Sequence, residues 1–239
     1  MKRLFRFLPV LALMSLLITS CEKIDGEGPI ITEDRSHSGF KSARVSISGQ
    51  VFHSVGNSYQ VRIHAQQNIL NIIQTRKDGD ELVIKFKDGK SVRRHQEIIV
   101  ELISPELNSV DLSGAANVTL QNVLTQSYLT LNVSGSGNIE ATGVDLESQL
   151  RAKISGSGNI RIHQGEVSTS WFRISGSGNI QTDAVNSNRA YAEISGSGDI
   201  RLKAIQALDA KISGSGSIWY RGTPQITTSI SGSGSIRPL

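Results

Sequence analysis

Val133-Ser-Gly-Ser-Gly-Asn-Ile139 is one copy of a heptapeptide that fills the second half of this 239-residue chain. A looser copy, Leu112-Ser-Gly-Ala-Ala-Asn-Val118, precedes it, and near-identical copies follow at residues 154–160, 174–180, 194–200, 212–218 and 230–236. Successive copies start 21, 21, 20, 20, 18 and 18 residues apart. A repeat of this length is typical of a solenoid, in which each coil buries its apolar side against its neighbours.

Within each coil, apolar residues occupy every second position, which indicates β-strands. The positions two and four residues before each copy share their parity with the copy's first and last residues, and most are apolar. The large Phe172 shares its coil with the small Ser170, as a narrow, densely packed interior requires. The opposite parity is polar and includes the row Glu140, Arg161, Gln181, Arg201, Trp219 and Arg237, which we interpret as a solvated face. The sequence therefore predicts an all-β solenoid with coils of about 20 residues.

The Ser-Gly-Ser-Gly stretch has two interpretations. An extended backbone would point both glycines inward, where another layer approaches closely, whereas a corner would use glycine to bend the chain. Because the looser copy has Ala116 at the second glycine position, we expect that site to tolerate a Cβ and the first site to require its absence. The first position is glycine in all seven copies: Gly114, Gly135, Gly156, Gly176, Gly196, Gly214 and Gly232. The Asn, Asp or Ser that follows the second position predicts a polar ladder at a turn.

The first residues read as a targeting signal. Residues 8–18 form an apolar run that is shorter than the ~20 residues of a membrane-spanning helix, and it follows the basic residues Lys2, Arg3 and Arg6. The run ends in Ile18-Thr-Ser-Cys21, which resembles the lipobox of bacterial lipoproteins. The resemblance implies cleavage of residues 1–20 and lipid attachment to Cys21, the only cysteine of the chain. The alternative is an ordinary secretory signal with an incidental cysteine.

Removal of this signal also removes most of the positive charge. The chain carries 25 Lys and Arg against 21 Asp and Glu, a net charge of +4, and loss of the three basic residues leaves 22 against 21. Net charge therefore gives no reason to expect nucleic acid as a partner. Residues 21–38 are polar and contain several glycines, so we expect them to form a flexible tether behind the lipidated cysteine.

Residues 39–237 are predicted to form one domain. Residues 40–110 repeat less clearly than the later coils but alternate in the same way, with strand candidates at 43–51, 59–65, 81–87 and 97–103. Turns at 77–80 and 87–90 each contain Asp-Gly. We interpret this region as earlier, more irregular coils that also cap one end of the solenoid.

These features together resemble the family called putative auto-transporter adhesin, head GIN domain, found mainly in envelope proteins of Bacteroidetes. The matching segments include Ile47-Ser-Gly-Gln-Val51, residues 105–114, the Ser-Gly repeats and the closing Ile218-Trp-Tyr-Arg-Gly-Thr-Pro224. The resemblance spans residues 40–237. It implies a right-handed parallel β-helix and an adhesin-type role, and it supplies no catalytic residue.

The best candidate for a recognition site is a row of outward-facing residues on consecutive coils. The position three residues before each copy reads Arg151, Trp171, Tyr191 and Asp209 over four coils. Exposed aromatic pairs bordered by polar groups suit the binding of a glycan or a peptide. The alternative is that a loop or the N-terminal region covers the two rings.

Catalytic and metal sites find less support. Gly196-Ser-Gly-Asp199 faintly resembles the repeat of calcium-binding β-rolls, but those present an aspartate in every repeat, and here only one copy is acidic. Polysaccharide cleavage needs two carboxylates across a sugar bond, and the candidates occupy mostly different positions of the repeat: Glu140, Asp183, Glu193, Asp199 and Asp209. The basic residues at 85–95 read as a solvated hairpin. We therefore predict no catalytic residue, no metal and no cofactor.

The sequence thus predicts a lipid-anchored protein of the cell envelope, an outer-membrane lipoprotein exposed at the surface, that binds or supports and does not catalyse. Its expected partners are the membrane, through the lipid on Cys21, and a glycan or protein ligand. Solenoid ends carry unpaired strand edges, so the fold is open to end-to-end self-association. The rival interpretation is a carbohydrate-active enzyme that cleaves polysaccharide on a β-helix.

Overall fold

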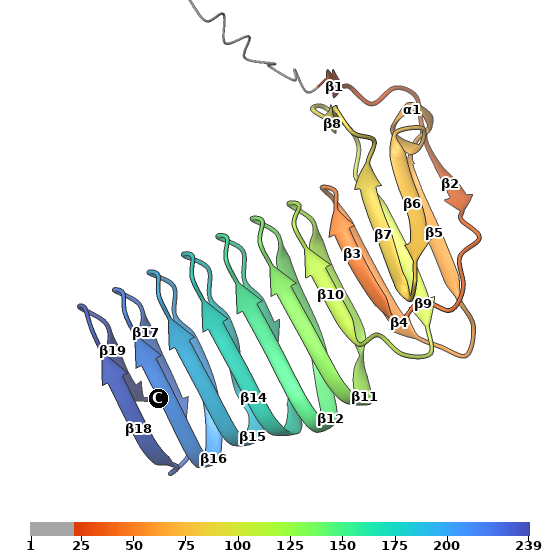
Figure 1. Ribbon diagram of the computed structural model, residues 1–239. Helices are drawn as coiled ribbons and strands as arrows, with labels where there is room; N and C mark the ends of the chain where they lie inside the picture. The colour runs from red at the N-terminus through yellow and green to blue at the C-terminus, as the bar shows by residue number, and fades with distance from the viewer. Residues whose placement is uncertain (1–21) are drawn as a thin grey trace, which may run out of the picture.

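The computed structural model describes residues 22–239 and shows a β-solenoid with an irregular cap at one end (Figure 1). The coils after residue 108 stack in chain order, and each pairs in parallel with the next. The prediction of an all-β solenoid of stacked parallel coils is therefore confirmed. The targeting signal and Cys21 lie outside the described residues.

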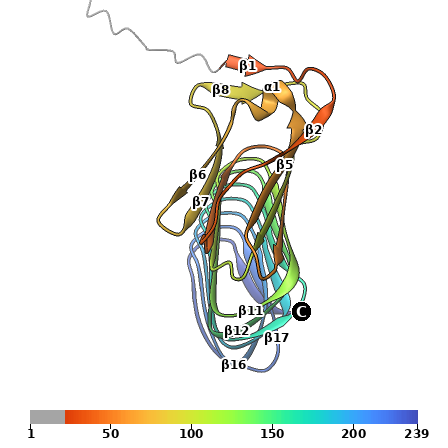
Figure 2. The ribbon, with the colours of Figure 1, turned by 90° about the vertical axis from the view of Figure 1, so that its right-hand side faces the viewer.

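The strands of the solenoid body belong to one continuous sheet that wraps into two faces, here called its two sheets, which meet at the Ser-Gly-Ser-Gly corners. They are β10 (Ser109–Leu112), β11 (Asn117–Val133), β12 (Asn138–Ile154), β13 (Ile160–Ile162), β14 (Gly165–Ile174), β15 (Ile180–Ile194), β16 (Ile200–Ile212), β17 (Ser217–Arg221), β18 (Gln225–Ile230) and β19 (Ser235–Pro238). Asn117 lies opposite Asn138, and Ile200 opposite Ile218, so the spacing of the heptapeptides equals the length of a coil. Seen along its axis, the solenoid is a flattened tube of nested coils (Figure 2).

The interior of the tube is filled by the apolar side chains at alternate positions of each coil. Ile154, Ile174 and Ile194, which begin three of the corners, are fully buried, and each such side chain contributes roughly 1.5–3 kcal/mol of transfer free energy. Phe172 and Ser170 are both buried in one coil, so a large and a small side chain share its narrow interior as predicted. The parity of the sequence therefore specifies which residues form the core.

Both glycines of each corner lie against the backbone of the preceding coil. A Cβ on Gly156 would stand 2.1 Å from the carbonyl oxygen of Gly135, and one on Gly158 would stand 1.8 Å from that of Gly137. The prediction that the second site tolerates a Cβ is wrong, because a backbone carbonyl leaves no room at either site. Ala116, on which that prediction rested, stands where the solenoid joins the cap.

The polar residue that follows each second glycine forms the predicted ladder. The Nδ2 of Asn138 donates to Oδ1 of Asn117 at 2.8 Å, Asn159 to Asn138 at 2.9 Å, and Asn179 to Asn159 at 3.0 Å. The ladder continues through the backbone N–H of Asp199, which donates to Oδ1 of Asn179 at 3.0 Å. These bonds link successive coils at the corner and do not require a ligand.

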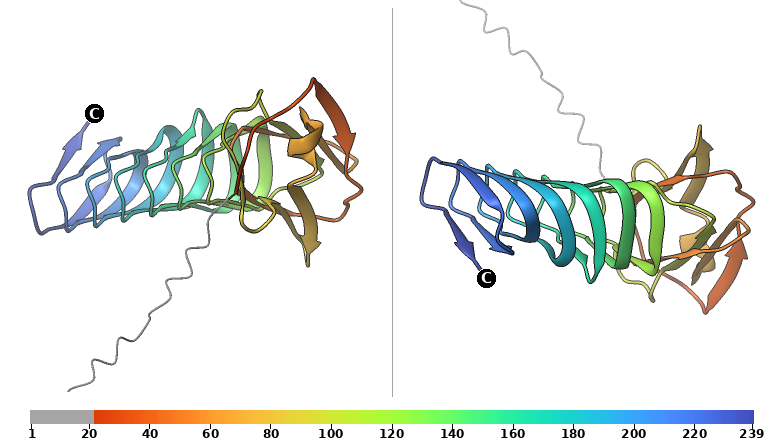
Figure 3. Two further views of the ribbon diagram at one scale, coloured as in Figure 1. Left: turned by 90° about the horizontal axis from the view of Figure 1, so that it is seen from above. Right: turned by 90° about the horizontal axis from the view of Figure 1, so that it is seen from below.

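The cap consists of the shorter elements that precede residue 105, gathered at one end of the tube (Figure 3). They are β1 (Glu22–Ile24), β2 (Ile30–Asp34), β3 (Ser42–Ser46), β4 (Gln50–Val55), β5 (Gln60–Gln66), α1 (Gln67–Leu70), β6 (Ile73–Asp78), β7 (Glu81–Phe86), β8 (Lys90–Val92) and β9 (Ile99–Ser104). Within residues 22–239, no helix is long and apolar enough to span a membrane.

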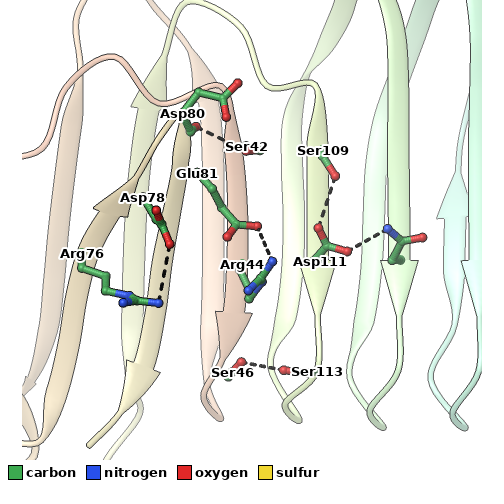
Figure 4. Close-up of polar contacts among 11 residues, drawn as sticks. Ser42, Arg44, Ser46, Arg76, Asp78, Asp80, Glu81, Ser109, Asp111 and Ser113 are labelled. Atoms are coloured by element: carbon green, nitrogen blue, oxygen red, sulfur yellow. Dashed lines mark hydrogen bonds and ion pairs between the residues drawn. The ribbon is translucent and has the colours of Figure 1, made fainter.

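The cap differs from a simple series of earlier coils in the order of its strands. The coil made by β3 and β4 pairs in parallel with β10 and β11 on one side and with β7 and β9 on the other. It therefore lies between segments that follow it in the chain. Arg44 joins Glu81 across this junction at 3.0 Å, and the Ser46 and Ser113 hydroxyls are 2.5 Å apart (Figure 4).

The outermost cap strands are antiparallel and do not form coils. β5 pairs with β9 and with β2, and β6 pairs with β7 through a hairpin at Gly79, whose φ is 60°. The predicted turns at Gly79 and Gly89 and the capping role are confirmed. Alternation alone does not distinguish parallel from antiparallel pairing, so the sequence did not reveal this change of direction.

The prediction of a flexible tether at residues 21–38 is wrong over its described part. β1 pairs with β8, and β2 pairs with β5. Ionic contacts hold this segment in place: Arg93 binds Asp25 through two nitrogens at 2.5 and 2.9 Å, and Lys90 binds Glu22. The acidic residues of this polar segment thus attach it to the cap. Their partners, Lys90 and Arg93, belong to the basic residues at 85–95.

Candidate functional site

The predicted outward-facing row lies on one sheet, across four adjacent coils. Arg151 of β12 is opposite Trp171 of β14, which is opposite Tyr191 of β15, which is opposite Asp209 of β16. We call these four residues the aromatic row. The solenoid brings them together because their spacing in the chain equals the coil length.

Trp171 and Tyr191 stack on one another face to face. Their ring centroids are 3.8 Å apart and their planes differ by 7°. Trp171 remains 42% exposed and Tyr191 is half-buried, so the alternative that another segment covers both rings is wrong. Each ring uses one face in this contact, and the other face points along the sheet, for Trp171 toward the coil of Arg151.

A shallow hollow of about 510 Å³ surrounds the stacked pair. Ion pairs between Arg173 and Glu193 at 3.4 Å and between Lys211 and Asp209 at 3.7 Å form part of its rim. Its remaining polar lining includes Asn132 and Lys153. The hollow therefore combines an exposed aromatic surface with hydrogen-bond donors and both signs of charge.

Arg151 is the member of the row whose side chain is turned aside. Its Nε donates to Oε1 of Gln149 at 2.8 Å, on the same strand. This bond ties the Arg151 guanidinium to its own strand, and Arg151 and Trp171 both line the hollow. Asp209 lies at the other end of the row, and its carboxylate is already paired with Lys211.

The five carboxylates considered for catalysis are held by different partners. Glu140 contacts His163 Nε2 at 2.5 Å, Asp183 contacts Arg221 at 3.3 Å, and Asp199 accepts the N–H of Ser217 at 2.7 Å. Glu193 and Asp209 belong to the ion pairs of the hollow. Across residues 22–239, no three His, Cys, Asp or Glu side chains are grouped closely enough to hold a metal ion.

A second channel, of about 600 Å³, crosses the other sheet and was not predicted from the sequence as a site. It is lined on one side by the asparagine ladder and on the other by a row that includes Arg161, Gln181 and Arg201. The signal that was available is the recurrence of arginine at one position of alternate coils, which we had interpreted only as solvation.

The comparison with known proteins matches this architecture to a family. The family model described as putative auto-transporter adhesin, head GIN domain, matches residues 39–224. The chain belongs to this family. The resemblance inferred from the Ser-Gly repeats is thereby confirmed, and the matched residues include the aromatic row and the whole lining of the second channel.

Solved structures of several other bacterial proteins share the fold. A putative adhesin from Bacteroides fragilis has 26% identity and a TM-score of 0.86, covering 90% of this chain and 100% of its own. A putative lipid binding protein from Parabacteroides distasonis has 25% identity and a TM-score of 0.75, covering 91% and 100%. A putative adhesin from Parabacteroides merdae, at 22% identity and a TM-score of 0.73, shows the fold alone. No curated protein matches this head GIN domain.

Proposed function

We propose that this head GIN domain protein is a lipid-anchored binding protein of the outer membrane that recognises a glycan in the hollow of the aromatic row. The observation that carries the proposal is the exposed stack of Trp171 on Tyr191, at a centroid distance of 3.8 Å. Large exposed aromatic surface is uncommon in this chain, of which aromatic residues make up 5%. The adhesin descriptions of the family and of its solved relatives support a binding role.

A sugar ring fits the chemistry of the hollow. The apolar face of a pyranose packs against the outer face of an indole ring, and its hydroxyl groups need donors and acceptors around that contact. Asn132 and Lys153 lie on the side of Trp171 that faces the coil of Arg151. The sheet fixes the backbone on which these groups stand, so binding requires no ordering of the main chain.

Binding without cleavage is the second part of the proposal. The carboxylates that line the hollow, Glu193 and Asp209, are each paired with a cation. A glycosidase needs two carboxyl groups placed across the scissile bond, and each of these two is engaged by a neighbouring cation instead. After prolonged incubation with the purified protein, a bound polysaccharide should be recovered at its original chain length, and shortened products would favour the carbohydrate-active enzyme.

The glycan site is tested by substitution of its central ring. Trp171→Ala should weaken binding on a glycan array by at least about tenfold, or ~1.4 kcal/mol, because it removes the surface on which the sugar packs. Tyr128→Ala is the matched control, since Tyr128 is 48% exposed and lies outside the hollow. Equal binding by the Trp171→Ala variant and the native protein would refute the site.

The lipid anchor is tested separately on intact cells. With Cys21 lipidated, the cap would stand directly at the membrane, because β1 begins at Glu22 and is paired with β8. We expect the native protein in the outer-membrane fraction and accessible to added protease, and Cys21→Ala released in soluble form. An unchanged membrane fraction for Cys21→Ala would contradict the anchor and leave the glycan site unaffected.

A further inference from the structure

The channel on the other sheet carries a regular row of positive charge. In register on successive coils lie Arg161, Gln181, Arg201, Trp219 and Arg237, which we call the arginine row. Arginine thus recurs on every second coil, at intervals of ~10 Å, since adjacent strands are ~4.8 Å apart. The solenoid sets this spacing, because each member occupies the same position of its coil.

The guanidinium groups of this row are free to meet a ligand. Arg161 and Arg201 are exposed, and within residues 22–239 neither forms an ion pair. The channel lining also holds two carboxylates: Glu140 is engaged with His163, and Asp199 accepts the N–H of Ser217 at 2.7 Å. Arg237 lies over the ring of Trp219, with its guanidinium carbon 5.9 Å from the ring centroid.

The asparagine ladder supplies neutral hydrogen-bonding groups along the same channel. Each of Asn138, Asn159 and Asn179 uses one N–H of its side-chain amide in the ladder, which leaves the other N–H for a ligand. The channel lining spans five successive coils, from Asn117 to Arg201. A ligand that follows it must be extended, carry hydroxyl groups and bear widely spaced negative charges.

We propose that the arginine row binds a linear polysaccharide that bears one carboxylate in each disaccharide. A disaccharide has about the length of two coils, so successive carboxylates fall opposite Arg161 and Arg201. Arginine binds carboxylate with two parallel hydrogen bonds, which favours carboxylate over a diffuse anionic surface. Nucleic acid fits poorly, because duplex DNA carries a charge every ~1.7 Å of its axis and the row offers one every ~10 Å.

The inference does not rest on the aromatic row, which lies on the opposite sheet. The probe is a hyaluronan octasaccharide, an unsulfated chain with one carboxylate per disaccharide, measured by isothermal titration calorimetry. We expect the native protein to bind it, the double variant Arg161→Gln/Arg201→Gln to bind at least about tenfold more weakly, and added salt to weaken native binding. Tyr128→Ala, at an exposed position outside both the channel and the hollow, should leave this binding unchanged.

Charge-matched controls make the outcome decisive. Arg76→Gln/Arg189→Gln removes the same charge from exposed positions outside the channel, and it should bind as the native protein does. Heparin and a neutral N-acetylglucosamine octasaccharide test the spacing and the charge. Stronger binding of heparin than of hyaluronan, equal loss in both double variants, or absence of hyaluronan binding by the native protein would each overturn the proposal.

Discussion

At the scale of single residues, the corner glycines are selected by space and only rarely by backbone conformation. Gly176 and Gly178 do not have the positive φ that favours glycine, whereas Gly232 does, at 126°. What they share is a carbonyl oxygen of the preceding coil where a Cβ would be. The repeat therefore reflects the close stacking of the coils, and the proposed recognition sites use residues that vary between copies.

Gly178→Ala should be strongly destabilising. Its Cβ would stand 1.7 Å from the carbonyl oxygen of Gly158, so the two coils must separate. We expect a loss of at least about 2–3 kcal/mol in the free energy of unfolding, as for severe overpacking, measured by urea denaturation. Ser177→Ala is the control, because Ser177 is exposed and its loss should change stability by less than about 0.5 kcal/mol. Equal stability of the two variants would contradict the steric argument.

A buried histidine makes the stability of the cap depend on pH. His53 is 1% exposed, and burial lowers its pKa from 6.5 to about 4. Its Nε2 bonds the Ser104 hydroxyl at 2.8 Å, and Ser104 donates to the carbonyl of Glu106. Ser104 therefore accepts the bond, and the proton lies on Nε2 of a neutral imidazole.

Since the folded pKa of His53 is depressed, the unfolded chain takes up the proton first as pH falls below 6.5. The stabilisation is complete above that pH and is lost as pH falls toward 4. We expect the unfolding free energy to drop by about 2 kcal/mol from pH 7.5 to pH 5 through this group. Urea denaturation at both pH values should show that His53→Leu abolishes most of this difference, and an unchanged pH dependence would contradict the assignment.

At the scale of elements, the sequence predicted repeating strands better than the strands of the cap. In each coil from β11 to β16 the apolar residues at alternate positions face the interior. Each coil then pairs with the coil before it and the coil after it in the chain. The segments that became β5 and β6 alternate equally well, but their partners β9 and β7 lie far along the chain or across a hairpin. Pairing direction depends on those partners, and a single strand's pattern does not contain it.

The attachment of β1 to β8 was hidden from the sequence for a different reason. It depends on Asp25 meeting Arg93, 68 positions away, and on Asn68 binding the backbone on either side of Gly26. The hydrogen bonds from Arg93 lower the pKa of Asp25 from 3.8 to about 2. The carboxylate thus stays ionised above that range, and its contribution is lost only as pH falls from 3.8 toward 2.

Asp25→Asn should release the segment before β2 while the solenoid stays folded. The amide loses the charge that binds the Arg93 guanidinium, which leaves Lys90 with Glu22 as the remaining ion pair between β1 and β8. Limited proteolysis should cut this variant between residues 22 and 29 faster than the native protein at pH 7. Asp183→Asn is the control, because Asp183 also pairs with an arginine, Arg221, but lies on β15 in the solenoid body. Equal cleavage of both would argue that strand pairing alone holds the segment.

At the scale of the whole molecule, both proposed sites follow from one property of the solenoid. Residues at the same position of successive coils form a row on the surface, and the aromatic row and the arginine row are both rows of this kind. The sequence predicted the first from its two aromatic residues. It did not predict the second as a site, because the spacing between charges has meaning only once the coils are known to stack in register.

Deletion of one complete coil should preserve this architecture. Removing residues 195–212 joins Ile194 to Ser213, and the next heptapeptide then follows β15 with the corner intact. Each coil contacts only its neighbours, so the remaining coils can close up. We expect a folded protein with a β-type circular dichroism spectrum and a urea m-value lower by about a tenth, in proportion to the surface lost.

Removing half a coil, residues 203–212, supplies the matched control. The strand that follows Leu202 would then begin on the wrong sheet, and every later apolar residue would be displaced from its partner. That variant should lose the cooperative unfolding of its C-terminal coils and become sensitive to protease there. If it unfolded as cooperatively as the complete-coil deletion, the body would owe its stability to something other than stacking in register, and neither surface row would be fixed by the repeat.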